Sequence, residues 1–137
     1  MKYFITYSLI SIFFFSITTL FYGCKDTINQ ADVDAVVIPD KDVSYQSHIQ
    51  PVMLLKCAFS GCHDDQTRAA GLSFTNFYNT VEDMTVVVPN EPQNSRLIWV
   101  VEGISGGSPM PPAGYPNMTI NQIKGFRTWV GEGAKNN

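Results

Sequence analysis

The sequence predicts a helical domain, because three stretches carry helix signals and the segments between them are rich in glycine, proline and polar residues. Residues 44–57 and 95–101 each begin with a serine that can act as an N-cap, and residues 119–130 begin with the Thr and Gln of a capping box. Pro51 lacks a backbone donor, so the first helix is expected to begin or to kink there. A short helical turn is expected over residues 76–81.

Apolar residues recur at helical spacing in all three stretches and predict the core of the domain. Gly125 lies inside the last helix, where glycine costs about 1 kcal/mol relative to alanine. That cost predicts a close approach by another backbone, for which the first helix is the natural candidate. The predicted inward-facing residues are Tyr45, Ile49, Val52 and Met53, then Leu97, Ile98 and Val101, and finally Ile120, Ile123, Phe126 and Val130.

The segment from Cys57 to His63 carries the chemistry of covalent haem attachment. Each of Cys57 and Cys62 can add to one vinyl group of haem as a thioether, and His63 directly follows the second cysteine. The usual spacing is C-x-x-C-H, so the four residues between these cysteines make a longer variant. The segment predicts one covalently attached haem c, with His63 as an axial ligand of its iron.

Two other interpretations of the cysteines remain open. A Cys57–Cys62 disulfide would make the chain a haem-free lipoprotein that acts as a binding module, but it leaves His63 without a role. Half of a zinc site would need a second pair of ligands, for which only Cys24 and His48 remain. His48 could instead be a second haem ligand, although an exposed helical histidine is the simpler interpretation.

The N-terminus predicts export and a membrane attachment. After Lys2, residues 3–22 form a nearly unbroken run of apolar, Ser and Thr residues that ends at Gly23-Cys24. This pattern predicts a lipoprotein signal peptide over residues 1–23 and a lipid-modified Cys24. The alternative is an uncleaved anchor, since about 20 apolar residues span a bilayer. Both interpretations predict a location in the cell envelope, on a bacterial membrane facing the periplasm or the cell exterior.

Residues 24–42 differ in composition from the rest of the chain. They contain five aspartates, two lysines and Pro39, which predicts a flexible acidic tether. The alternative is that residues 33–38 form a strand or pack on the domain. The haem domain is expected to cover residues 43–137.

A second informative stretch leads to Met110. Residues 103–109 are too rich in glycine and serine for a helix or strand, and two prolines follow the methionine. These prolines fix the backbone directly after a thioether that can bind iron. Met84 and Met118 are the competing thioethers, but one precedes an apolar run and the other a helix start. Met110 is therefore the predicted sixth ligand.

Together these motifs resemble the cytochrome c superfamily, and more closely the small exported bacterial domains of the planctomycete-cytochrome type. The resemblance covers residues 44–137 and implies an all-α, cytochrome c-like fold of about three to four helices around one covalently bound haem, with long loops. It also implies that Cys57 and Cys62 attach the haem, that His63 is the proximal ligand and that Met110 is the distal one. The similar segments are residues 49–52, 57–63, 88–89, 94–97, 110–112, 129–130 and 133–134.

These observations predict a membrane-tethered mono-haem electron carrier, or the electron-transfer subunit of a redox complex, rather than an enzyme. An iron bound by His and Met has no vacant position for a substrate. The alternative is an open iron that binds a small ligand or supports peroxidase-like chemistry, should Met110 not be a ligand. Trp99 is expected either to contact the porphyrin or to pack in the core.

The charge distribution limits the partners that the chain can have. Lys and Arg do not cluster, so nucleic acid is not expected as a partner. Residues 43–137 hold seven acidic side chains against six Lys and Arg, which predicts weak charge steering. The expected partners are redox proteins and, through the lipid anchor, the membrane; no small-molecule substrate is expected.

Overall fold

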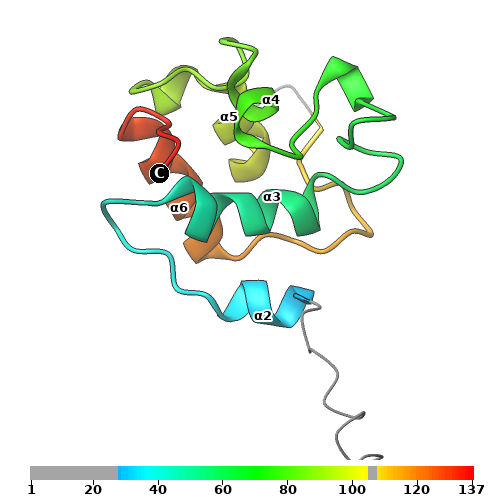
Figure 1. Ribbon diagram of the computed structural model, residues 1–137, viewed down its shortest axis with the longest axis horizontal. Helices are drawn as coiled ribbons and strands as arrows, with labels where there is room; N and C mark the ends of the chain where they lie inside the picture. The colour runs from blue at the N-terminus through cyan, green and yellow to red at the C-terminus, as the bar shows by residue number, and fades with distance from the viewer. Residues whose placement is uncertain (1–27, 105–107) are drawn as a thin grey trace, which may run out of the picture.

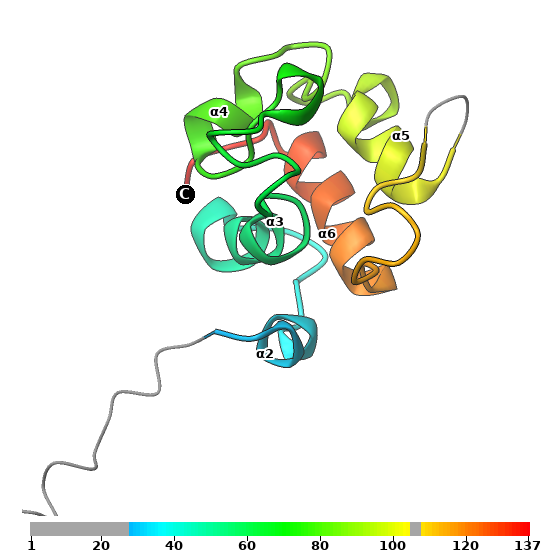
Figure 2. The same cartoon turned by 90° about the vertical axis from the view of Figure 1, so that its right-hand side faces the viewer.

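The structure, a computed structural model, describes residues 28–104 and 108–137 of the 137-residue chain. The predicted signal peptide and Cys24 lie outside these ranges. The described part contains α-helices, shorter helical turns and no strand, so the expectation of a helical protein is confirmed (Figures 1 and 2). The described ranges hold five α-helices, where about three to four helices were expected. They are α2 (Gln30–Ala35), α3 (Gln50–Lys56), α4 (Phe77–Val81), α5 (Arg96–Glu102) and α6 (Ile120–Gly131).

The segment before the cysteines forms one helical stretch of two kinds. The hydroxyl of Ser44 accepts a hydrogen bond from the backbone N–H of Ser47 at 3.1 Å and caps a π-helical turn, Tyr45–Ile49. α3 follows without a break, with Pro51 in its first turn, where the missing donor has no intrahelical partner to lose. The predicted cap and the predicted change at Pro51 are both present.

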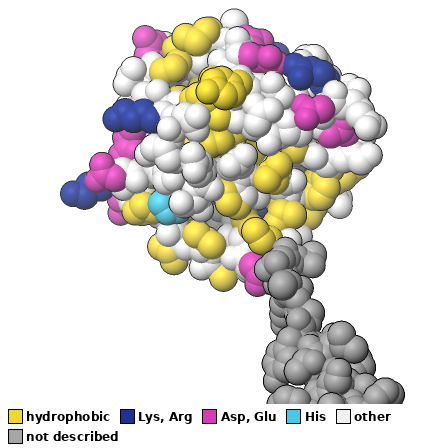
Figure 3. Space-filling model, viewed as in Figure 1, with side chains coloured by type: hydrophobic (Ala, Val, Ile, Leu, Met, Phe, Trp, Pro, Cys, Tyr) yellow, Lys and Arg dark blue, Asp and Glu magenta, His cyan; other side chains and the backbone are white. Residues whose placement is uncertain are grey.

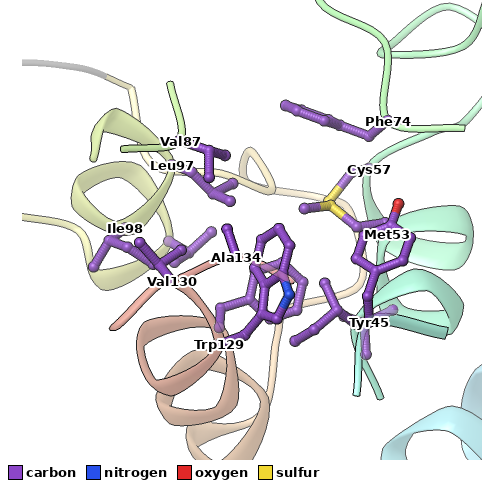
Figure 4. Close-up of a cluster of buried hydrophobic side chains, with 14 of the residues drawn as sticks. Tyr45, Met53, Cys57, Phe74, Val87, Leu97, Ile98, Trp129, Val130 and Ala134 are labelled. Carbon is purple, nitrogen blue, oxygen red and sulfur yellow. The ribbon is translucent and has the colours of Figure 1, made fainter. Parts of the chain in front are cut away.

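The last helix, α6, lies at the centre of the core. Thr119 and Gln122 form the predicted capping box, with backbone-to-side-chain hydrogen bonds of 2.9 and 3.1 Å. Trp129 is fully buried, and its ring centroid lies 5.4 Å from that of Tyr45 in the turn before α3. Figure 4 shows the Trp129 ring between side chains of the α3 region and side chains of α5. Helix α6 therefore packs between the α3 region and α5.

Residues 28–42 pack on the domain, as the alternative interpretation of this segment allowed. Asn29 and Asp32 form a capping box that begins α2, and the side chains of Val33 and Ile38 are buried. The side chain of Asn121 in α6 bonds both backbone groups of Ile38, at 2.8 and 2.9 Å. This part of the predicted tether is thus held by apolar burial and by side-chain hydrogen bonds, which its acidic composition did not reveal.

Gly125 makes close contact with that N-terminal segment, not with the first helix as expected. A Cβ atom at position 125 would lie 2.6 Å from Cγ2 and 3.1 Å from Cβ of Ile38. Carbon atoms that are not bonded to each other need about 3.5 Å or more. The glycine is therefore required by the Ile38 side chain, which packs directly on the α6 backbone.

The variant Gly125→Ala is expected to lower the free energy of unfolding by about 1–2 kcal/mol, because overpacking costs more than the gain in helix propensity. Chemical denaturation measures the change. Gly131→Ala is the matched control in the same helix, since its Cβ would meet only Pro92 at an ordinary 3.8 Å. The cost at position 125 should shrink in an Ile38→Ala background; an unchanged cost would show that Ile38 is not its cause.

No helix within the described ranges combines the length and the apolar character that a membrane crossing needs.

Candidate functional site

Four of the predicted site residues line one cavity of about 270 Å³. They are Cys57, Cys62, His63 and Met110. Cys57 directly follows α3, Cys62 and His63 belong to the next loop, and Met110 comes from the segment that follows α5. The fold thus brings together two thiols, an imidazole and a thioether from positions up to about two fifths of the chain apart.

The rest of the cavity wall is mainly apolar. It is built by the loop after His63, by the buried turn before α5, by α5 itself and by the proline-rich segment after Met110. A large, flat apolar molecule is stabilised in such a space by removal of its faces from water. The wall includes Leu72, Phe74, Val86, Leu97, Val101 and Pro111.

The loop between the cysteines is held by its own backbone. The N–H of Cys57 donates to Met53 at 2.9 Å and ends α3, while the N–H of Cys62 donates to Phe59 at 2.9 Å. The N–H of His63 then donates to the carbonyl of Cys57 at 3.2 Å. These bonds close the four-residue spacing into a compact turn, so the longer motif still places both thiols and the imidazole at one cavity.

Asp64 stabilises the C-terminal part of the same loop through hydrogen bonds to its backbone. Its carboxylate accepts backbone hydrogen bonds from Gly61 at 2.8 Å, Gln66 at 2.7 Å and Thr67 at 2.6 Å. These bonds, that from Thr67 above all, hold the pKa of the Asp64 carboxyl below its ordinary value. Gly61 has a positive φ of 87°, which favours glycine at this turn.

The imidazole of His63 is held by packing and contains a buried nitrogen atom without a hydrogen-bond partner among the described residues. Its ring centroid lies 4.9 Å from that of Phe74, and the N–H of Phe74 donates to the His63 carbonyl at 3.0 Å. Its Nδ1 atom is buried and has no hydrogen-bond partner among the described residues. A buried polar nitrogen left unpaired costs about 1–3 kcal/mol. The ring is thus positioned by the protein, while its Nδ1 atom is left without a partner among the described residues.

Met110 is anchored to α5 through its backbone. The N–H of Met110 donates to the carbonyl of Val100 at 3.0 Å, and the Met110 side chain is half-buried at the cavity. Met84 is exposed and Met118 packs against the core, and neither lines the cavity. Of the three methionines weighed from sequence, only Met110 therefore lies where a thioether can bind a group in the cavity.

The two cysteines differ in their surroundings. Cys57 is buried, whereas Cys62 is partly exposed, and both are free thiols in the structure. Burial raises the pKa of the Cys57 thiol to about 12, an effect that the neighbouring Lys56 opposes. Cys57 is therefore protonated at neutral pH in this fold. Among the described residues, no three His, Cys, Asp and Glu side chains are arranged so that they could hold a metal ion, as a zinc site of the usual kind would require.

A buried cation beside Cys57 was not expected from sequence. The side chain of Lys56 is completely buried, and its ammonium bonds Asp34 of α2 at 2.6 Å and the carbonyl of Asn117 at 2.5 Å. The ion pair holds the pKa of the Asp34 carboxyl below its ordinary value, chiefly through the hydrogen bond from Lys56. Lys56 also lines the cavity, so this network ties the N-terminal segment to the wall of the site.

The variant Asp34→Asn is expected to lower the free energy of unfolding by about 2–3 kcal/mol at neutral pH, because it leaves a buried ammonium without a counter-charge. The folded pKa of Asp34 lies below the unfolded value of about 3.9. Its contribution is therefore complete above that value and is lost as the pH falls through the folded pKa. The gap between parent and variant should narrow below about pH 4 in denaturation experiments.

Asp40→Asn is the control for this change. Asp40 pairs with Lys124 at 3.0 Å, but both side chains are well exposed, so its loss should cost well under 1 kcal/mol. Equal effects of the two variants would contradict a special role for the buried pair.

Arg96 is the other cation on the cavity wall and was also not singled out as a site residue. It is the first residue of α5, and its side chain is exposed. No carboxylate of the described residues lies within ion-pair distance of it. Its guanidinium is therefore available to an anionic group at the edge of the cavity. In the sequence it appeared only as part of the segment 94–97 that resembles the cytochromes.

Two further residues weighed from sequence lie away from the cavity. The Nδ1 atom of His48 accepts a hydrogen bond from the N–H of Ser44 at 3.0 Å and serves the helix start. The indole of Trp99 donates to the carbonyl of Gln93 at 2.7 Å, and its side chain is partly exposed. Trp99 thus neither lines the cavity nor lies in the core.

The donor set fits a haem. Two thiols can form thioethers, while an imidazole with an unused nitrogen and a thioether can both bind iron. The mainly apolar wall suits a porphyrin, and Arg96 offers a cation for its carboxylates. These features come from residues 56–115, which include the two cysteines, His63 and the Met-Pro-Pro segment.

A comparison with known proteins agrees with this chemistry. Residues 60–114 match the family model of Planctomycete cytochrome C. The matched range contains Cys62, His63 and Met110, and it begins after Cys57. No curated protein and no solved structure matches the chain. The family match supports the assignment of this chain to a cytochrome c-like family, which suggests haem-based electron transfer and a carrier rather than an enzyme.

Proposed function

We propose that the chain is a membrane-tethered mono-haem c-type cytochrome that transfers single electrons between protein partners. One observation carries the proposal: Cys57, Cys62, His63 and Met110 meet at one mainly apolar cavity. The match of residues 60–114 to the cytochrome family supports the same function.

Each residue has a distinct task in this proposal. Cys57 and Cys62 hold the haem through thioether bonds, and His63 and Met110 bind the iron. When bound, haem supplies an iron that alternates between the ferric and ferrous states. Two protein ligands leave the iron no vacant position for a substrate, and the thioether favours the ferrous state. The residues present therefore favour electron transfer over substrate chemistry.

The cavity wall and its edge complete the site. Apolar side chains such as Phe74 and Leu97 exclude water from the porphyrin faces and lower the local dielectric constant. Arg96 would pair with a haem carboxylate at the exposed edge. Partner proteins would dock there through contacts of short range, because residues 43–137 carry nearly balanced charge.

The visible spectrum of the protein, made in a host that matures c-type haem, tests the proposal. The spectrum is recorded oxidised and reduced, before and after denaturing extraction. Sharp reduced haem bands that survive extraction would support covalent attachment at the cysteines. Colour that is lost on extraction would exclude a c-type cytochrome, and a protein that never gains colour would favour the haem-free binding module.

A further inference from the structure

The end of the molecule that carries α2 exposes four large apolar side chains. Ile28 is 62% exposed, Val36 44%, Val37 79% and Ile120 86%. Ile28 precedes α2, Val36 and Val37 follow it, and Ile120 is the first residue of α6. We call these four residues the α2 surface.

Hydrogen bonds hold the parts of this surface together. Asn121, next to Ile120, bonds both backbone groups of Ile38, next to Val37. The side chain of Gln122 bonds the carbonyl of Val33 at 3.3 Å and Asp34 at 2.9 Å. Because α2 and the start of α6 are joined in this way, the exposed side chains are presented by a fixed scaffold rather than by a loose tail.

The figures show where this surface lies. Figures 1 and 2 place α2 at one end of the molecule, beneath α3 and opposite α4. In Figure 3, hydrophobic side chains gather over the lower part of the visible face, the part nearest α2, while most charged side chains lie at its left and upper edges. Single exposed apolar residues are common on proteins, but a group at one end of the molecule indicates a binding surface.

The short distance in sequence between Ile28 and Cys24 indicates what the α2 surface contacts. Ile28 lies only four positions after Cys24, so the chain between them has four Cα–Cα steps. Fully extended, they span at most about 14 Å, whatever path they take. The polar interfacial layer of a bilayer is itself roughly 5–8 Å thick on each side. A lipid on Cys24 would therefore keep α2 within about one helix diameter of the membrane surface.

We propose that the α2 surface docks on the lipid bilayer and holds the domain in one orientation, with α2 toward the membrane. This inference rests on the proposed lipid anchor at Cys24. The docking is apolar: the exposed charges nearby are of both signs, among them Asp32 and the Asp40–Lys124 pair, so anionic lipid is not required. Anchor and surface act together, since one weak attachment becomes far more effective when a second holds it close.

The test uses the full lipidated chain in phosphatidylcholine vesicles that contain a photoreactive phosphatidylcholine. After illumination, mass spectrometry locates the lipid cross-links. We expect them in peptides that contain residues 28–37 and 118–121, and we expect their loss in the double variant Val37→Asp with Ile120→Asp. The control is Tyr78→Asp, whose parent side chain is 74% exposed on α4, at the other end of the molecule.

Each other outcome overturns the docking surface. Cross-links spread evenly over a vesicle-bound protein would show that the domain moves freely on its anchor. Cross-links centred elsewhere would show a different orientation, and protein–protein cross-links at the α2 surface without lipid would identify a second copy as its occupant.

Separate measurements show whether the proposed function itself, rather than the docking surface, is wrong. The mass of the N-terminal peptide reports lipidation, and the visible spectrum reports haem. If Cys24 carries no lipid, the proposed lipid anchor is wrong. Cross-links from added vesicles that still map to the α2 surface would then support its docking on the bilayer. Their absence would contradict that docking.

Discussion

Replacing Met110 with alanine is expected to leave the haem attached, to lower its reduction potential and to let carbon monoxide bind the ferrous iron. Alanine removes the thioether that favours the ferrous state and leaves a position for an external ligand. Axial ligands set haem potentials over a range of roughly 0.8 V, and a fall on the order of 0.1–0.2 V is expected here. Redox titration measures the reduction potential. The reduced spectrum with and without carbon monoxide shows whether the iron has an open coordination position.

Met84→Ala is the matched control, because Met84 is an exposed methionine outside the cavity. It should change neither the potential nor carbon monoxide binding. Met118→Ala controls for the loss of a methionine that packs against the core, and it should affect stability alone. If the parent protein binds carbon monoxide as readily as Met110→Ala, Met110 is not a ligand. The iron would then be open, and small-ligand binding or peroxidase-like chemistry would become the better hypothesis.

The features that were predictable from sequence depend on neighbouring residues. The caps at Ser44 and Thr119 form as expected, because an N-cap bonds a backbone group only two or three positions away. The interruption at Pro51 and the burial of Phe126 and Val130 in α6 follow from covalent geometry and helical spacing, whereas Ile120, which was also expected to face inward, is exposed at the start of that helix. Such signals need no knowledge of the rest of the fold.

The packing of the N-terminal segment could not be predicted in the same way. Its acidic residues indicate a solvated chain, yet Asp34 finds its partner in Lys56, and Ile38 finds its place on Gly125. Both partners lie far along the chain, and neither sequence pattern names the other. The glycine did signal a close approach, but only the tertiary structure shows which segment makes it.

The sequence pointed to four side chains that the structure places at the cavity, and it said less about the cavity wall. Cys57, Cys62 and His63 form a local motif, and the two prolines distinguish Met110 from the other methionines. Arg96 carried no such signal, because one arginine at a helix start is usually a solvated side chain. Its place at the cavity depends on how α5 packs, and this is a property of the whole fold.

Replacing both Cys57 and Cys62 with serine is expected to abolish all haem that survives denaturation. Serine cannot form the thioether, and the remaining contacts at the cavity are noncovalent. Each single variant keeps one thiol, so it should retain at most one thioether. Haem staining after denaturing electrophoresis detects the covalent fraction, and the mass of the protein counts the haem it carries.

Cys24→Ser is the control that separates attachment of haem from attachment to the membrane. It should keep the full haem signal while losing the lipid, because Cys24 lies outside the cavity segment of the chain. Burial of Cys57 adds a second expectation: with its thiol pKa raised to about 12 in the folded domain, haem attachment to Cys57 should precede final folding.

Haem that stays fully bound in the double serine variant after denaturation would show that neither thiol holds it, and the c-type assignment would then be wrong.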